Sequence, residues 1–302
     1  MTSLSFSGFF FQSFFYDGTP IAKYYAKQAE LERVHEEEVF DYMDSVLFGD
    51  GKIEDGDSVK LAPSASAEEG AEVTEKIFTW DKWVVGVAFV FVWLMMAPQV
   101  HRLRVTHFGY LCLAFYLATV ALFKGINGGA AFSELAIPAS ATRWGACLAL
   151  FVWLWVDRKP ASELKTVKAI LILAVSLTFF AHGYEAFKIH PHFRDLLYGS
   201  LEAIGIALNE TLAVIILKSI GVMDILLALI ILFHRHRMVL LWMAIWGGLT
   251  AFSRPVALGS EMWMETLLRT TNFGVPFILF LLYRSGEKKQ KKHPSGTVEQ
   301  NH

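Results

Sequence analysis

The chain has 302 residues, 54% of them hydrophobic, with 25 phenylalanines and a mean hydropathy of +0.40. This composition excludes a typical soluble domain, because the apolar residues come in blocks long enough to cross a bilayer, about 17–25 residues each. The formal net charge of −2 says nothing about partners, because the charge is unevenly distributed along the chain. The apolar blocks predict the lipid bilayer as partner, and no nucleic acid is expected. The sequence therefore predicts an all-α, polytopic membrane protein. Cys112 and Cys147 both fall inside apolar runs and are expected to act as small hydrophobic residues, not as a disulfide.

The first region, residues 1–48, combines an aromatic start with a soluble helix. The opening stretch, "MTSLSFSGFFFQSFFYDG", lacks a basic n-region and a small-residue cleavage site, so we expect no cleavable secretion signal. Its phenylalanines either touch the membrane surface or pack onto the rest of the protein. Residues 19–47 are expected to form the helix, with Thr19 as N-cap and Pro20 at the first helical position. This helix is also the candidate surface for a protein partner.

Residues 49–80 form an acidic segment rich in Gly, Ser and Ala, a composition typical of a flexible linker. Within it, "GDGKIEDGD" superficially resembles a calcium-binding loop. The spacing of its acids does not match the EF-hand order of ligands, and the bidentate glutamate is not in place. A solvated linker is therefore the expectation.

The remaining chain predicts seven membrane helices, three in residues 81–165 and four in residues 166–284, before a basic tail at 285–302. The expected spans are 82–100, 106–124, 136–156, 166–187, 209–233, 238–253 and 264–283. With seven spans, thirteen Lys and Arg residues lie on the same side of the membrane as the C-terminal tail, either in the tail or in and next to the loops of that side. The loops of the opposite side hold only four. Because such a bias sets orientation, we expect a multi-pass protein of the cell membrane with a cytoplasmic C-terminus and the N-terminus outside.

Three ionisable residues lie within the helix predicted at 209–233. Glu210 and Asp224 share a face at about 100° per residue, and Lys218 is close enough to Asp224 for its long side chain to reach it. An ionisable group at membrane depth costs about 2.5–3.5 kcal/mol, so each requires a partner or a function. Asp224 is either a proton-linked or redox-site carboxylate, or an acid paired with Lys218 that fixes the bundle. Arg143, in the third helix, is a further deep cation.

The last helix places Glu265, Arg269 and Asn272 along one face, and Glu four residues before Arg is the favourable order for an ion pair. If this pair faces the interior, it could orient a carbonyl or anionic group. If it faces the outer interface, it only snorkels towards water. Arg254, followed by Pro255, is expected to close the sixth helix on the same side of the membrane.

Titratable residues also gather where the fourth helix leaves the membrane, in "FFAHGYEAFKIHPHFRD". His182 and Glu185 are three residues apart and can share a helix face, and the helix is expected to end near His190, before Pro191. The group matches no tight metal motif, so we expect water or headgroups around it and no metal. Residues 192–206 predict an amphipathic segment in the outer interface. Together these residues can form the rim of a pocket.

Residues 169–283 resemble a DoxX-like four-helix membrane domain. The resemblance rests on four stretches in order: "FFAHGYEAFKIHPHFRDLL" (179–197), "IGVMDILLALIILF" (220–233), "WGGLTAFSRP" (246–255) and "WMETLLRTTNFGVPFILFLL" (263–282). The family is named for a small subunit of a thiosulfate:quinone oxidoreductase, and many members have no demonstrated reaction. The resemblance implies a four-helix bundle, a link to quinone or thiol redox chemistry, and five polar positions to test: His182, Asp224, Arg254, Glu265 and Arg269. The three extra helices and the outer region depart from the minimal family pattern.

Three functions are open at this point. The first is a quinone-associated redox subunit, at most an oxidoreductase subunit, with a pocket in the helix bundle. The second is a non-catalytic membrane scaffold that binds a partner through residues 19–47. The third is a proton-coupled small-molecule transporter with Glu210, Lys218 and Asp224 as coupling groups. The candidate polar pocket comprises His182, Glu185, Glu210, Lys218, Asp224, Arg254, Glu265 and Arg269.

Overall fold

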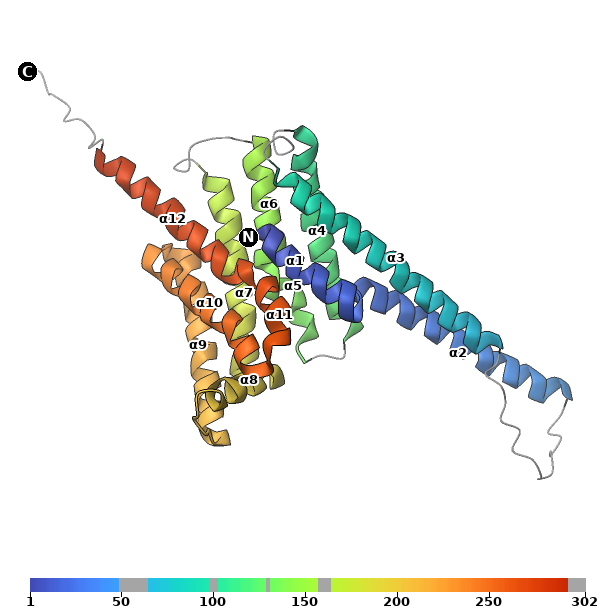
Figure 1. Cartoon of the computed structure of the whole chain (residues 1–302). Coiled ribbons are helices and arrows are strands. Elements are labelled where there is room, and N and C mark those ends of the chain that lie inside the picture. Colours follow the sequence, from blue (N-terminus) through green and yellow to red (C-terminus); the bar gives the residue numbers. More distant parts are fainter. Residues whose placement is uncertain (49–64, 98–102, 129–130, 157–163, 293–302) are drawn as a thin grey trace, which may run out of the picture.

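The computed structural model describes residues 1–48, 65–97, 103–128, 131–156 and 164–292. Every regular element in these ranges is a helix, which confirms the predicted all-α fold (Figure 1). The cysteines are free, with Cys147 buried and Cys112 exposed, as their positions in apolar runs predict. The calcium-like stretch and the first half of the predicted linker lie outside the described residues.

Six helices of the described chain are long and apolar enough to cross a membrane, and a bent pair makes a seventh span. The six are α3 (Ala65–Met95), α4 (Arg104–Asn127), α6 (Ala141–Val156, preceded by η3, Ser133–Leu135, and α5, Ala136–Ala139), α7 (Lys165–Phe187), α9 (Glu210–His234) and α10 (Arg237–Leu258). The bent pair is α11 (Trp263–Leu268) and α12 (Thr270–Lys292), which meet at an angle of 44°. The predicted spans are therefore present, but the last one is broken and not a continuous helix.

The aromatic start packs onto the rest of the protein, which decides between the two predicted positions. Residues Thr2–Gln12 form helix α1, and η1 (Ser13–Asp17) follows. Phe6 and Phe9 are buried in a core shared with α3, α4 and α6. Gly8 contacts α11 so closely that a β-carbon there would lie 2.4 Å from the backbone nitrogen of Leu268. Helix α1 therefore depends on a glycine at this position.

The predicted soluble helix is α2 (Pro20–Phe48), and its start is fixed by Thr19. The buried Thr19 donates from its backbone N–H and its hydroxyl to the two carboxylate oxygens of Asp81, at 2.7 and 2.6 Å. Helices α2 and α3 form a hairpin that extends away from the bundle (Figure 1). Residues 65–80 belong to α3 and not to a flexible linker, because Ala and Glu favour helix and Glu72 pairs with Lys76 one turn later.

Helices α7, α9, α10 and α12 pack together as a four-helix bundle. Helix α6 packs against α7 on one side and against α4 on the other. Between membrane helices close packing replaces the hydrophobic effect, so small residues mark the tightest contacts. Gly183 of α7 and Gly221 of α9 lie at such a contact, because a β-carbon on Gly221 would come within 2.6 Å of the Gly183 carbonyl oxygen.

The connection from α7 to α9 contains the predicted amphipathic segment as helix α8 (Pro191–Glu202), which packs on α10. As expected from Pro191, the preceding helix ends first, and the His190 side chain accepts from the backbone N–H of His192 as N-cap. The end of the bundle where α8 lies is called the α8 end below.

Proline does not close α10, contrary to expectation. Helix α10 continues through Pro255 to Leu258. A proline in a helix deprives the carbonyl four residues earlier of its N–H donor, which is Ala251 in this helix. The hydroxyl of Thr266 on α11 donates to that carbonyl at 3.0 Å. A contact from another helix therefore replaces the lost hydrogen bond.

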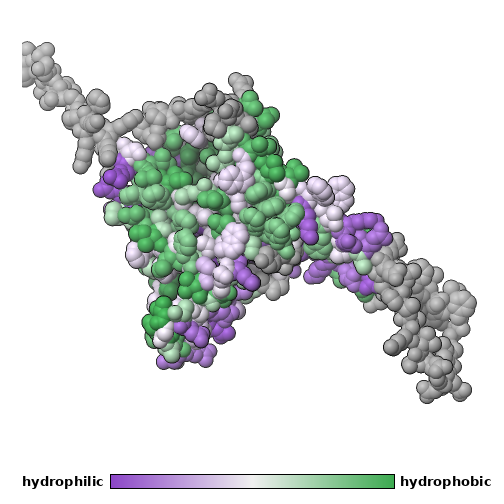
Figure 2. Space-filling model, in the orientation of Figure 1, coloured by the Kyte–Doolittle hydropathy of each residue, from purple (hydrophilic) through white to green (hydrophobic). Residues whose placement is uncertain are grey.

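The surface agrees with a membrane location. Apolar side chains cover most of the visible face of the bundle, whereas polar residues gather at the projecting hairpin and at the bundle ends (Figure 2). Trp83, Val87 and Phe91 of α3 are 68%, 65% and 41% exposed, as suits a helix whose outer face contacts lipid. The α8 end is the predicted outer side, and this orientation stays a prediction.

Candidate functional site

Two cavities meet at the α8 end of the bundle. The polar cavity has a volume of about 760 Å³ and lies between α1, α4, α6, α7 and α11. The apolar cavity has a volume of about 420 Å³ and lies between α7, α8, α9 and α10. Both volumes fall within the range of small-molecule sites, about 300–1,000 Å³. The walls of the two cavities share five side chains: His182, Phe193, Leu196, Arg254 and Arg269.

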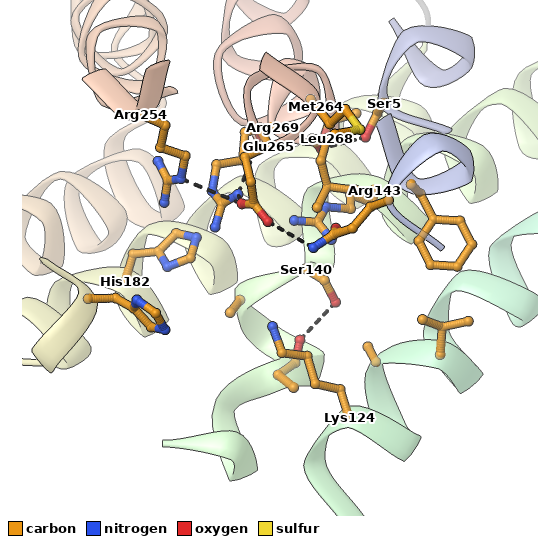
Figure 3. A pocket seen from close by; sticks show the side chains of 18 of the residues that line it. Ser5, Lys124, Ser140, Arg143, His182, Arg254, Met264, Glu265, Leu268 and Arg269 are labelled. Carbon is orange, nitrogen blue, oxygen red and sulfur yellow. Dashed lines mark hydrogen bonds and ion pairs between the residues drawn. The ribbon is translucent and has the colours of Figure 1, made fainter. Parts of the chain in front are cut away.

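A single carboxylate organises the polar cavity. Glu265 forms an ion pair with Arg269 four residues later, and its Oε2 lies 3.6 Å from the Nε of Arg254 on α10. The side-chain amide of Gln12 on α1 donates to its Oε1 at 3.0 Å. The predicted Glu265–Arg269 pair is thus confirmed and faces the interior. Figure 3 shows the arginines directed toward one region of the cavity from separate elements.

The polar cavity also contains a buried guanidinium without a direct hydrogen-bond or ion-pair partner in the described chain. Arg143 enters the cavity from α6, and its guanidinium has no hydrogen bond or ion pair among the described residues. Its Nε is buried. Lys124 reaches into the same cavity from α4 and likewise has no ion-pair partner in the described chain. These two groups add positive charge to the cavity beside the two arginines that pair with Glu265.

Hydrogen bonds between α6, α7 and α12 fix the backbone next to Arg143. The hydroxyl of Thr142 donates to the side-chain oxygen of Asn272 at 2.8 Å and lies 3.3 Å from that of Thr271. The backbone N–H of Thr142 donates to the hydroxyl of Thr178 at 3.1 Å. The three threonines are fully buried, so this network fixes the backbone beside Arg143.

The histidines of residues 179–195 have different partners. His182 and Glu185 form the predicted pair on α7, with Nδ1 and Oε2 3.1 Å apart, and both line the polar cavity. His190 is held by its N-cap bond and by a contact of 3.1 Å between its Nε2 and the carbonyl oxygen of Ala131. The described residues hold no cluster of three or more His, Cys, Asp or Glu that could bind a metal.

The apolar cavity holds two polar atoms without partners. Asp224 of α9 is 7% exposed, and its Oδ1 has no hydrogen-bond partner in the described chain. The hydroxyl of Ser200 on α8 is buried and likewise has none among those residues. Around them the wall is mostly Leu, Ile, Phe and Trp, including Trp246. A ligand in this cavity would meet an apolar surface with a few fixed polar groups, which is the usual design of a small-molecule site.

The structure brings six of the eight candidate residues to the two cavities. His182, Glu185, Arg254, Glu265 and Arg269 line the polar cavity, and Asp224 lines the apolar one. Glu210 and Lys218 line neither and are exposed.

Lys218 makes no ion pair with Asp224, because it extends from an exposed face of α9 while Asp224 points inward. The interpretation of Asp224 as half of a structural pair is therefore wrong.

Three residues that line the polar cavity were not among the eight candidates: Gln12, Lys124 and Arg143. The sequence marks Arg143 as a deep cation, and its charge within an apolar run is the signal that points to it. Lys124 stood at a helix end, where basic residues usually meet water. Gln12 could not be found from sequence, because its role depends on the insertion of α1 beside Glu265.

Comparison with protein families, with curated proteins and with solved structures finds no match for this chain. The site is therefore interpreted from its own geometry. It combines a cationic cavity, an apolar cavity and a shared wall that contains two arginines.

Proposed function

We propose that this protein is a quinone-binding membrane subunit that holds the quinone ring in the apolar cavity. The proposal is supported above all by the buried carboxylate of Asp224, whose Oδ1 has no hydrogen-bond partner in the described chain. A quinol hydroxyl can donate to this carboxylate. A quinone carbonyl can accept from the Ser200 hydroxyl or from the guanidinium groups of Arg254 and Arg269 at the inner wall.

The lipid-facing side of the cavity suits a ligand that arrives from the bilayer. Ile204 and Leu249 belong to the cavity wall and are 65% and 60% exposed. Ile204 follows the amphipathic helix α8, at the predicted membrane interface, and Leu249 belongs to α10. A quinone with an isoprenoid tail would place its ring inside and leave its tail among lipids.

The resemblance to DoxX-like domains supports the same class of ligand, and membership of that family is part of this proposal. The transporter alternative needs Glu210, Lys218 and Asp224 to act together, and only Asp224 lies in a cavity. The scaffold alternative rests on α2 and predicts a bound protein that is lost when residues 19–47 are removed.

The test is a titration of the purified, full-length protein with decylubiquinone and with its reduced form. Quenching of tryptophan fluorescence reports binding, because Trp246 lines the cavity and Trp246→Phe should remove part of the signal. We expect Asp224→Asn to weaken binding of the reduced form about tenfold, since it replaces one of the two carboxyl oxygens by an amide nitrogen that donates and cannot accept. The oxidised form should lose less affinity.

The matched control is Glu210→Gln, an acid-to-amide change on the same helix outside both cavities. It should bind both forms like the unchanged protein. Absence of saturable quenching, or equal losses in Asp224→Asn and Glu210→Gln, would contradict the proposal.

A further inference from the structure

The polar cavity holds one positive charge more than its acids can neutralise. Lys23 of α2 reaches the cavity wall, but it is exposed and has a partner of its own, so it is set aside. The other lining residues include four basic and three acidic side chains, an excess of one positive charge when the histidines are neutral. A charged group at membrane depth is costly unless it is paired, so this excess requires a counter-charge or water.

Arg143 is the cation that the acids of the cavity do not pair. Glu265 pairs with the two other arginines and accepts from a side-chain amide of α1. Glu185 pairs with His182 on its own helix. Glu261 is exposed in the short helix η4 (Ser260–Met262). The guanidinium of Arg143 therefore has no acceptor among the described residues, although it enters the cavity (Figure 3).

The backbone that carries Arg143 is held in position before any ligand arrives. Arg143 follows Thr142, whose N–H donates to the Thr178 hydroxyl and whose hydroxyl donates to the Asn272 side chain. The Nε of Arg143 is buried as well. A guanidinium fixed in this way presents paired N–H donors, which match the two oxygens of a carboxylate. Because the donors are already placed, little freedom is lost when such a group binds.

Part of the wall of the same cavity is apolar. Lys124 lies one turn beyond Val120 and two turns beyond Leu117 on α4, and all three line the cavity. Phe6 and Phe9 of α1 line it too and belong to the same hydrophobic core as Val120 and Leu117. The four apolar side chains are at most 9% exposed. A ligand would therefore meet hydrocarbon on the side of α1 and α4 and positive charge at the other residues of the wall.

We infer that the polar cavity binds an amphipathic monocarboxylate, with its carboxylate on Arg143 and Lys124 and its hydrocarbon part against the apolar wall of α1 and α4. A carboxylate is ionised at pH 7 and carries a single negative charge, which neutralises the excess of the cavity. A phosphate monoester carries about −1.5 to −2 charges at pH 7 and would leave unpaired negative charge at membrane depth. A halide ion would supply the charge, but it does not match the paired donors of a guanidinium group.

The experiment measures the thermal unfolding midpoint of the full-length protein in phosphatidylcholine nanodiscs. Sodium octanoate is titrated against sodium chloride of equal ionic strength, which corrects for screening. Three further probes separate the parts of the ligand: 1-octanol has the chain without the charge, acetate has the charge without the chain, and octyl phosphate has a more highly charged head. We expect a saturable rise of the midpoint with octanoate and none with 1-octanol. Acetate and octyl phosphate should require concentrations about tenfold higher or more.

Arg143→Gln should weaken octanoate binding about tenfold or more, because it removes the charge and the paired donors. Arg194→Gln is the matched control, since Arg194 is an exposed arginine of α8 outside both cavities. If Arg143→Gln fails to fold, Lys124→Gln replaces it, because Lys124 is exposed and belongs to neither hydrophobic core. It too should weaken octanoate binding relative to Arg194→Gln.

Three results would overturn the inference: no saturable response to octanoate, a response that 1-octanol, acetate or octyl phosphate matches at equal concentration, or equal responses in the cavity variant and in Arg194→Gln. The inference does not rest on the proposed quinone site. Arg143 and Lys124 do not line the apolar cavity, so quenching by decylubiquinone should be unchanged in both variants. Failure of one proposal is thus distinguishable from failure of the other.

Discussion

Replacing Thr266 by valine tests how the bundle accommodates a proline inside α10. The hydroxyl of Thr266 is the donor to the Ala251 carbonyl, which Pro255 leaves without a helical N–H. Both residues are buried, Ala251 fully and Thr266 to 7% exposure. Valine keeps the branched shape of the side chain and removes only the donor, so the carbonyl would be left unpaired.

The expected loss of stability follows from leaving the Ala251 carbonyl without a hydrogen-bond donor. A buried acceptor without a partner costs about 1–3 kcal/mol in soluble proteins, and side-chain hydrogen bonds between membrane helices measure about 0.6–1.7 kcal/mol. We therefore expect Thr266→Val to lower the free energy of unfolding by about 1–2 kcal/mol. Equilibrium unfolding in mixed micelles, followed by far-UV circular dichroism, measures this difference.

A double-mutant cycle between Thr266 and Pro255 tests whether this loss of stability arises because the proline leaves the Ala251 carbonyl without a helical donor. Pro255→Ala restores a backbone N–H that points at the Ala251 carbonyl, so in this background Thr266→Val should cost less than about 0.5 kcal/mol. Thr250→Val is the control for losing a hydroxyl, because Thr250 donates at 3.1 Å to a helical carbonyl, that of Gly247. An equal cost of Thr266→Val with and without Pro255→Ala would refute the reasoning.

Two further changes test the packing and the charge of the site. Gly221→Ala should destabilise the protein by about 1–3 kcal/mol, because the new β-carbon would lie 2.5 Å from the backbone nitrogen of Phe187. Gly248→Ala should be nearly neutral, since its nearest neighbour would be 3.9 Å away, and equal effects of the two changes would contradict this account. Glu265→Gln removes the carboxylate shared by two arginines and should cost about 1–3 kcal/mol, less than a fully buried pair because Glu265 keeps 24% exposure. The same unfolding assay measures this cost, and an unchanged stability would mean that the arginines do not need Glu265.

Local patterns in the sequence predicted the features that depend on local structure. The spans follow from apolar runs, and the pairing of Glu265 with Arg269 follows from a spacing of four residues. The end of α7 before Pro191 follows from the limits that proline imposes on the residue before it. In each case one short stretch contains all the groups that interact.

Features that depend on contacts between distant segments could not be predicted in the same way. The break at Arg269 is compatible with a helical pattern, and only the surrounding helices determine the bend of 44°. Arg143 was visible as a charge in an apolar run, but its entry into the polar cavity depends on how α6 packs against α4, α7 and α12. The error for Lys218 has the same origin, because helical spacing says which residues are near each other and not which face is buried.

The aromatic start shows most clearly why the site needs the whole chain. A broken helix at membrane depth exposes backbone carbonyls, which lipid cannot satisfy. Helix α1 covers the break: the hydroxyl of Ser5 donates to the carbonyl oxygen of Leu268, the last residue of α11, at 2.7 Å. Gly8 allows the two backbones to approach, and Gln12 completes the hydrogen bonds of Glu265. The first helix therefore does not act as a surface anchor. It forms one wall of the polar cavity and makes the broken helix compatible with the membrane.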